Sequence, residues 1–307
     1  MARRIKHPIA TGFVIVLVVV LAAGALVVYR WATTRWAITV VPPTVRCQAT
    51  IGTETAGTDT ASITPEQAQN AAIIAGVATQ RGLAPRAVSI ALTTAFQESN
   101  LINVDYGDRD SLGLFQQRPS MGWGTPDQIM NPYYSSGKFY DALVKVSDWQ
   151  TGDIGDVAQE VQRSGFPDAY DKHVDQAKLL ASALSGQTPA SWSCIVRGAA
   201  APDPNQLLTA LTQAYGATIT ASLTPAAPAS VAPSASASST PASLAITASD
   251  QAVAWSVAAF AQSWAVQTGV SAVSVGDSTW TASANVLSGW VATSAATSDG
   301  TSVTVTF

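Results

Sequence analysis

The chain has 307 residues, of which 47% are hydrophobic and only 12% are charged, and its formal net charge is −4 at pH 7. Its Lys and Arg residues form no cluster beyond the N-terminal end, which excludes a surface that follows nucleic-acid phosphates. Nucleic acid is therefore not expected as a partner. The length allows two domains with connectors between them.

The first distinctive segment is the apolar stretch at 9–29. Since about 20 apolar helical residues cross the hydrocarbon core of a bilayer, we expect one transmembrane helix here, with a tail at 1–8 and a linker at 30–62. Arg3, Arg4 and Lys6 precede it and favour a cytoplasmic N-terminus, with the main part of a single-pass cell-membrane protein outside the cytoplasm. A cleaved signal peptide is the alternative, because small residues at 23–25 suit a signal peptidase.

The chain contains two cysteines, Cys47 and Cys194, which bracket the middle of the sequence. In an extracytoplasmic compartment such a pair is typical of a disulfide that joins the two ends of a domain. Two unpaired buried thiols are the alternative if the compartment is reducing.

The segment 63–196 has the pattern of a mainly helical domain. Thr64, Pro65 and Gln67 form a capping-box signature for a helix that ends near Gly82. A second helix begins at Pro85, and its apolar spacing continues to position 99. Further helical patterns cover 140–146, 154–163 and 169–184.

The remaining sequence predicts a linker at 197–243, rich in Ala, Pro and Ser, with one short helix at 203–216. A small accessory α+β domain is expected at 244–307. Its pattern indicates a helix at 251–266 and strands at 272–275, 278–282, 287–292 and 302–307. Few charges and several tryptophans suggest that this domain binds a cell-envelope protein, although Trp255 and Trp264 are expected in its core because they lie on the helix.

Glu98 is the main catalytic candidate. Ala95, Phe96 and Leu101 surround it in the sequence, so its carboxyl group is expected to be poorly solvated. Desolvation favours the neutral form and raises the pKa of a carboxyl toward that of a useful proton donor. Such an acid suits cleavage of a glycosidic bond, in which the leaving oxygen must be protonated.

Glu98-Ser99, followed by Gly113-Leu114-Phe115-Gln116, resembles the Glu-Ser and Gly-Leu-Met-Gln signatures of the lytic transglycosylases. These belong to the lysozyme-like superfamily and cut bacterial peptidoglycan. The resemblance covers about 64–184 and departs from the family in having Phe115 in place of Met. It implies a helical lysozyme-like fold and cleavage between N-acetylmuramic acid and N-acetylglucosamine. Glu98 then acts first as acid and afterwards as base toward the sugar C6 hydroxyl or water.

The resemblance also suggests supporting residues. Ser99 would orient Glu98, and Gln116 and Gln117 are candidates to bind acetamido groups. Their alternation suggests that only one of the two faces the cleft, and by the resemblance it is Gln116. The third family signature, Ala-Tyr-Asn, is absent; in its place Gln162 or Tyr170 is expected to contact Glu98 or the substrate. Independently of the resemblance, Trp123 and Tyr133 offer flat apolar faces for sugar rings.

Asp110 has two interpretations, which also apply to Asp108. Either a carboxylate before Gly113 serves as a second catalytic carboxylate, or it only caps the loop through backbone hydrogen bonds. His7 and His173 are the only histidines, so we expect no metal site and no cofactor. A second function also remains open, a non-catalytic lysozyme-like scaffold or binding subunit of an envelope assembly such as a secretion or conjugation machine.

Overall fold

The computed structural model describes residues 44–53, 57–162, 169–226, 241–292 and 300–307. Thr44–Phe307 form one compact unit. The helices of the described residues are α2 (Pro65–Gln80), α3 (Pro85–Ser99), η1 (Pro119–Met121), α4 (Pro126–Ile129), α5 (Pro132–Leu143), α6 (Ile154–Gln162), η3 (Asp171–His173), α7 (Val174–Leu184), α8 (Pro204–Tyr215), η4 (Gly216–Thr218), α9 (Gln251–Ser263) and α10 (Ala265–Thr268). The strands are β1 (Cys47–Thr53), β2 (Gly57–Ile63), β3 (Trp192–Cys194), β4 (Ile219–Thr224), β5 (Ser243–Ala248), β6 (Ala272–Val275), β7 (Ser278–Thr281), β8 (Val291–Ala292) and β9 (Ser302–Thr306).

A small antiparallel sheet has the strand order β2-β1-β3. Cys47 pairs with Cys194 in the register of β1 and β3, and a disulfide joins them, which confirms the predicted bridge. The expectation of a linker up to residue 62 is wrong, because β1 and most of β2 lie in that segment. The sequence did not predict these strands for two reasons. Strand β2 is Thr-rich and exposed over its first half, so it lacks an alternating apolar pattern. Strand β1 pairs with β3, which is distant in the sequence.

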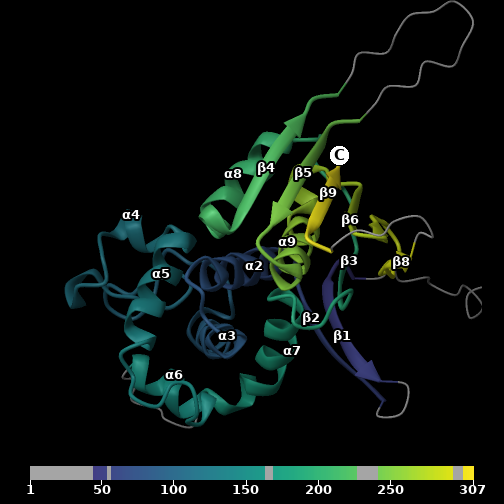
Figure 1. Ribbon diagram of the computed structural model, residues 1–307. Helices are drawn as coiled ribbons and strands as arrows, with labels where there is room; N and C mark the ends of the chain where they lie inside the picture. Colours follow the sequence, from purple (N-terminus) through teal and green to yellow (C-terminus); the bar gives the residue numbers. More distant parts are fainter. Residues whose placement is uncertain (1–43, 54–56, 163–168, 227–240, 293–299) are drawn as a thin grey trace, which may run out of the picture. The chain divides into compact units, whose positions relative to one another are not determined.

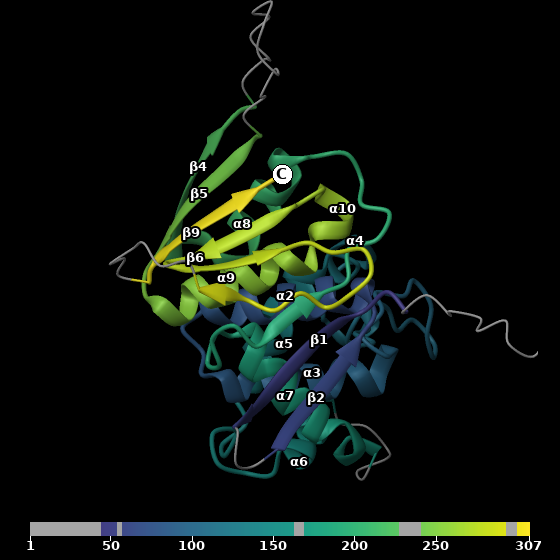
Figure 2. The ribbon, with the colours of Figure 1, turned by 90° about the vertical axis from the view of Figure 1, so that its right-hand side faces the viewer.

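A larger antiparallel sheet has the strand order β4-β5-β9-β6-β7-β8. Helices α8 and α9 cover one of its faces (Figure 2). Alternation of apolar and polar residues produces this layering, since successive side chains of a strand point to opposite faces. Leu244 and Ile246 of β5 and Val303 and Val305 of β9 are buried, whereas Ala245 and Thr304, which lie between them, are exposed.

Helix α2 contacts α3, α5, α7, α8 and α9 (Figure 1). The predicted capping box is confirmed, because Thr64 and Gln67 exchange side-chain and backbone hydrogen bonds. Small residues let the neighbouring helices approach closely. A Cβ added at Gly76 would lie 2.8 Å from the Cβ of Ala214 in α8, so the glycine is required by helix packing.

The expected fold class, a mainly helical lysozyme-like domain with a separate small α+β domain, is wrong. In the described residues the helices and both sheets share one hydrophobic core. Tyr215 of α8 and Ser256 of α9 exchange a hydrogen bond of 2.8 Å, and Ser256 donates to the carbonyl oxygen of Leu184 in α7 at 2.7 Å. The short helix predicted at 203–216 is confirmed as α8, but the predicted linker at 197–243 is wrong where it contains β4; its stretch 227–240 lies outside the described residues.

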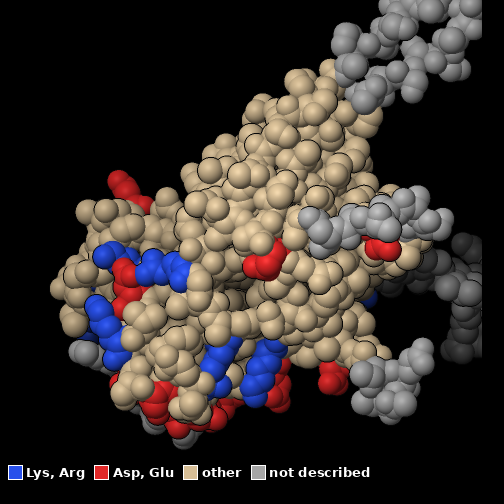
Figure 3. All heavy atoms as spheres, in the orientation of Figure 1, with Lys and Arg blue, Asp and Glu red and all other residues tan. Residues whose placement is uncertain are grey.

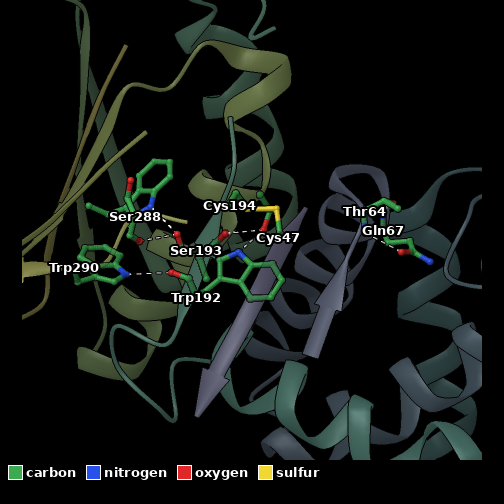
Figure 4. The surroundings of a disulfide bond; sticks show 11 residues. Cys47, Thr64, Gln67, Trp192, Ser193, Cys194, Ser288 and Trp290 are labelled. Carbon is green, nitrogen blue, oxygen red and sulfur yellow. Dashed lines mark hydrogen bonds between the residues drawn. A yellow bond between two sulfur atoms is a disulfide. The ribbon is translucent and has the colours of Figure 1, made fainter. Parts of the chain in front are cut away.

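Trp290 of the C-terminal half lies beside β3, the strand that carries Cys194 of the disulfide (Figure 4). Trp290 donates to the carbonyl oxygen of Trp192 at 3.2 Å, and Trp280 donates to Ser193 at 3.1 Å. Trp255 is buried and meets Trp290 edge to face, and Trp264 stacks on Phe260. The core role expected for Trp255 is therefore confirmed, whereas Trp264 is partly buried and packs against the core.

The expectation of a single-pass membrane protein is corrected as well. Among the helices in the described residues, none is both long enough and apolar enough to cross a bilayer. The predicted transmembrane stretch at 9–29 lies outside the described residues.

Candidate active site around Glu98

Glu98 lies in the last turn of α3, which ends where Asn100 adopts a left-handed conformation with φ of 53°. Its carboxyl oxygen Oε1 accepts a hydrogen bond of 2.5 Å from the hydroxyl of Tyr170. Burial raises the pKa of Glu98 above its ordinary value, and the Tyr170 hydrogen bond opposes this with a smaller effect. Burial thus biases the carboxyl toward its protonated form, which is the requirement for a proton donor.

Ser99 links the end of α3 to the turn at 113–116. Its hydroxyl oxygen lies 2.8 Å from the carbonyl oxygen of Leu114 and 3.1 Å from that of Ala95. From the other side, the Gln162 side chain of α6 donates to the carbonyl oxygen of Phe115 at 3.2 Å. The Glu98-Ser99 and Gly113-Leu114-Phe115-Gln116 motifs therefore lie next to each other. The hydrogen bond from α6 stabilises the turn.

The two glutamines after the turn differ in environment. Gln116, with φ of 46°, lines a surface groove, and its amide donates to the carbonyl oxygen of Tyr106 at 3.2 Å. Gln117 is only 1% exposed and donates to the carbonyl oxygen of Ser135 at 3.1 Å. Only Gln116 of the two therefore faces the groove, and Gln117 is not placed to bind substrate because its side chain points into the core.

The groove beside the turn has a volume of about 750 Å³. The loop after the turn, α5 and α6 supply its walls. Its polar and aromatic lining includes Gln116, Arg118, Trp123, Lys145, Glu160 and Gln162. Glu98 does not line this groove; it lies behind the turn, to which Ser99 connects it.

Contacts with Tyr134 fix the backbone at Trp123, which lines this groove. Its carbonyl oxygen accepts a hydrogen bond of 3.2 Å from the hydroxyl of Tyr134. The next residue, Gly124, has φ of 145°, and an added Cβ would lie 2.8 Å from the Tyr134 ring, so the close approach requires glycine. Tyr133, the other predicted sugar-binding aromatic, lines a different cavity together with Asn131 and Gln213, so its placement in the sugar groove is wrong.

Asp110 is held by the loop that follows it. Arg118 donates to one carboxyl oxygen at 2.8 Å, and the Ser120 backbone N–H donates to the other at 2.8 Å. The Arg118 guanidinium and the Ser120 hydrogen bonds hold the pKa of Asp110 well below its ordinary range. These contacts are those of the loop-capping interpretation. Asp108 is exposed beside Arg109, with which it makes a contact of 3.8 Å.

Tyr170 is fully buried, so the expectation that it binds substrate is wrong; its contact with Glu98 was the other predicted option. Close by, His173 stacks on Phe96 of α3 with ring centroids 5.7 Å apart. This stacking and the Tyr170 bond attach the segment before α7 to the end of α3. Sequence reasoning missed Arg118, Lys145 and Glu160 as lining residues, since isolated charged residues in a loop or helix carry no distinguishing pattern.

Within the described ranges, no three His, Cys, Asp or Glu side chains gather in a way that would hold a metal ion. A comparison with models of known protein families finds no match to this chain, and a comparison with curated proteins finds no significant similarity.

Proposed function

We propose that this protein cleaves the glycan strand of peptidoglycan between N-acetylmuramic acid and N-acetylglucosamine, with Glu98 as the acid and base. The observation that carries the proposal is the Glu98 carboxyl itself. It is mostly buried, burial raises its pKa, and Tyr170 fixes its orientation at the base of the turn at 113–116. A protonated, oriented carboxyl next to the turn that borders a polar groove fits general acid catalysis of glycosidic cleavage.

The mechanism uses the same carboxyl twice. Protonated Glu98 gives its proton to the oxygen of the leaving sugar as positive charge develops at the anomeric carbon. The carboxylate then accepts a proton from the incoming nucleophile, which is water or the C6 hydroxyl of the muramic acid. The N-acetyl group of the substrate stabilises the cationic centre, so a second protein carboxylate is not required. This assignment fits Asp110, which is already occupied by Arg118 and Ser120.

The decisive experiment compares the wild-type protein with Glu98→Gln on purified peptidoglycan. Released fragments are identified by mass spectrometry. Anhydro sugar ends indicate intramolecular transfer to the C6 hydroxyl, whereas reducing ends indicate hydrolysis. We expect Glu98→Gln to lower release at least 100-fold, since general acid catalysis contributes roughly 10²- to 10⁴-fold. Glu66→Gln, at an exposed glutamate in the first turn of α2, is the matched control and is expected to act like wild type.

One observation favours a second candidate function. Glu98 does not line the groove of about 750 Å³, and a site without direct access would bind glycan without cutting it. The protein would then be a binding subunit of an envelope assembly. Saturable binding of glycan fragments, with no release by the wild-type protein, would select this alternative.

A further inference from the structure

A second groove, of about 450 Å³, lies beside the first. The two grooves share Met121, Trp123 and Lys145, so they are continuous around the Trp123 side chain. Lys138 of α5 and exposed Val144 line only the second groove. A ligand that occupies the first groove could therefore extend a branch past Trp123 into the second.

The charges of the second groove are unbalanced. Asp141 lines it, but its carboxylate is paired with Arg81. Within the described part of the chain, no carboxylate lies within ion-pair distance of Lys138 or Lys145. The Lys138 ammonium instead lies 5.6 Å from the centroid of the Tyr134 ring. Two ammonium groups without carboxylate partners favour an anionic ligand.

Charged side chains of both signs gather over the helical part of the molecule that contains α5, while the surface over β4 and β5 is almost uncharged (Figure 3). The first groove, in contrast, contains Glu160 as well as Arg118, and Arg118 is paired with Asp110. The excess of positive charge is thus specific to the second groove.

Apolar side chains flank the two lysines. Met121 is 66% exposed and Val144 is 46% exposed, so both offer apolar surface to a ligand in the groove. A short peptide with carboxylates and small apolar side chains complements both features. A bare sugar chain complements neither the charge nor the apolar patches.

We propose that the second groove binds the peptide stem of a glycan strand, with Lys138 and Lys145 pairing with stem carboxylates. This inference rests on the proposed function, because the glycan of peptidoglycan carries such stems. It adds that the protein selects stem-bearing strands, and that Lys138 and Lys145 determine this specificity while Trp123 separates the stem from the sugar chain.

The test uses peptidoglycan fragments with free stem carboxylates and the same fragments after chemical conversion of these carboxylates to amides. Binding is measured by calorimetry with full-length Glu98→Gln, and turnover with the wild-type protein. We expect the free-carboxylate form to bind roughly two- to thirtyfold more tightly, since an exposed ion pair contributes about 0.2–1 kcal/mol and two are formed. The preference is expected to weaken with added salt.

Variants then assign the preference to the groove. Lys138→Gln combined with Lys145→Gln is expected to raise KM for the free-carboxylate form and to remove most of the preference, whereas Lys138→Arg retains it. Lys178→Gln is the control, at an exposed lysine of α7 that lies 3.8 Å from Asp175. Equal binding of both fragment forms, or tighter binding of a peptide-free polyglycerol phosphate, would overturn the stem assignment.

The two proposals fail in different ways. If the wild-type protein cuts both fragment forms equally well, the stem site is wrong and the cleavage proposal stands. If it binds the free-carboxylate form selectively but cuts nothing, the cleavage proposal is wrong and the stem site stands.

Discussion

At the scale of single residues, two opposing effects act on the Glu98 carboxyl. Burial raises its pKa and is the larger effect, while the hydrogen bond from Tyr170 lowers it. The carboxyl must be protonated to act as an acid, so the loss of activity at high pH follows its pKa. Any change that raises this pKa moves the alkaline limb of the pH profile to higher pH.

Tyr170→Phe is therefore expected to move the alkaline limb upward, because it removes the effect that lowers the pKa of Glu98. The same change is expected to reduce kcat roughly 10- to 150-fold, since a hydrogen bond to a charged group contributes roughly 1.5–3 kcal/mol and also fixes the carboxyl. The measurement is the pH dependence of kcat on soluble glycan fragments. Tyr106→Phe, at a tyrosine that is 72% exposed, serves as the control. An alkaline limb that moves downward would contradict this assignment.

The sequence predicted part of this site. The apolar neighbours of Glu98 indicated a raised pKa, and the spacing of the two motifs indicated the nearby turn. The resemblance also selected Gln116 rather than Gln117 for the cleft. The physical reason lies in the tertiary structure, where the positive φ of Gln116 and the packing of the turn direct Gln117 into the core.

At the scale of elements, the bridge between Cys47 and Cys194 holds β1 to β3. Replacing both cysteines by alanine is expected to lower the free energy of unfolding by roughly 4–5 kcal/mol, the chain-entropy value for a loop closed over a sequence separation of 147 residues. Urea unfolding of the oxidised protein and the double variant measures this difference. A double variant with an unchanged midpoint would show that the bridge does not restrain the unfolded chain.

The elements themselves were predicted unevenly. The starts of α2 and α3 follow from capping residues and prolines close to them in the sequence, so local signals were sufficient. The strands β1 and β2 have few apolar residues, and β3 is only three residues long. Their pairing depends on residues distant in sequence, which local patterns do not report.

At the scale of the whole molecule, the helices and the larger sheet share one core. Helix α2 contacts α8 and α9, and the chain from Thr44 to Phe307 forms one compact unit. We therefore expect this unit to unfold in a single thermal transition, with a calorimetric enthalpy close to the van't Hoff enthalpy. Differential scanning calorimetry measures both.

Truncation provides the matching control. A fragment that spans 44–196 keeps the disulfide and the site but loses α8 and α9, so one side of α2 becomes exposed to water. It is expected to lack a cooperative transition in circular dichroism. Two separate transitions in the intact protein, or a stable fragment, would show that the halves fold independently.

The sequence alone determined where α2 and α3 begin, which cysteines pair, and that Glu98 lies in apolar surroundings. Each of these depends on neighbouring residues or on there being only one possible partner. The tertiary structure decided the joining of the two halves, the contact between Tyr170 and Glu98, and the two lysines of the second groove. These features arise where segments far apart in the chain bury apolar surface together, and the free energy of that burial depends on the packed arrangement rather than on any local pattern.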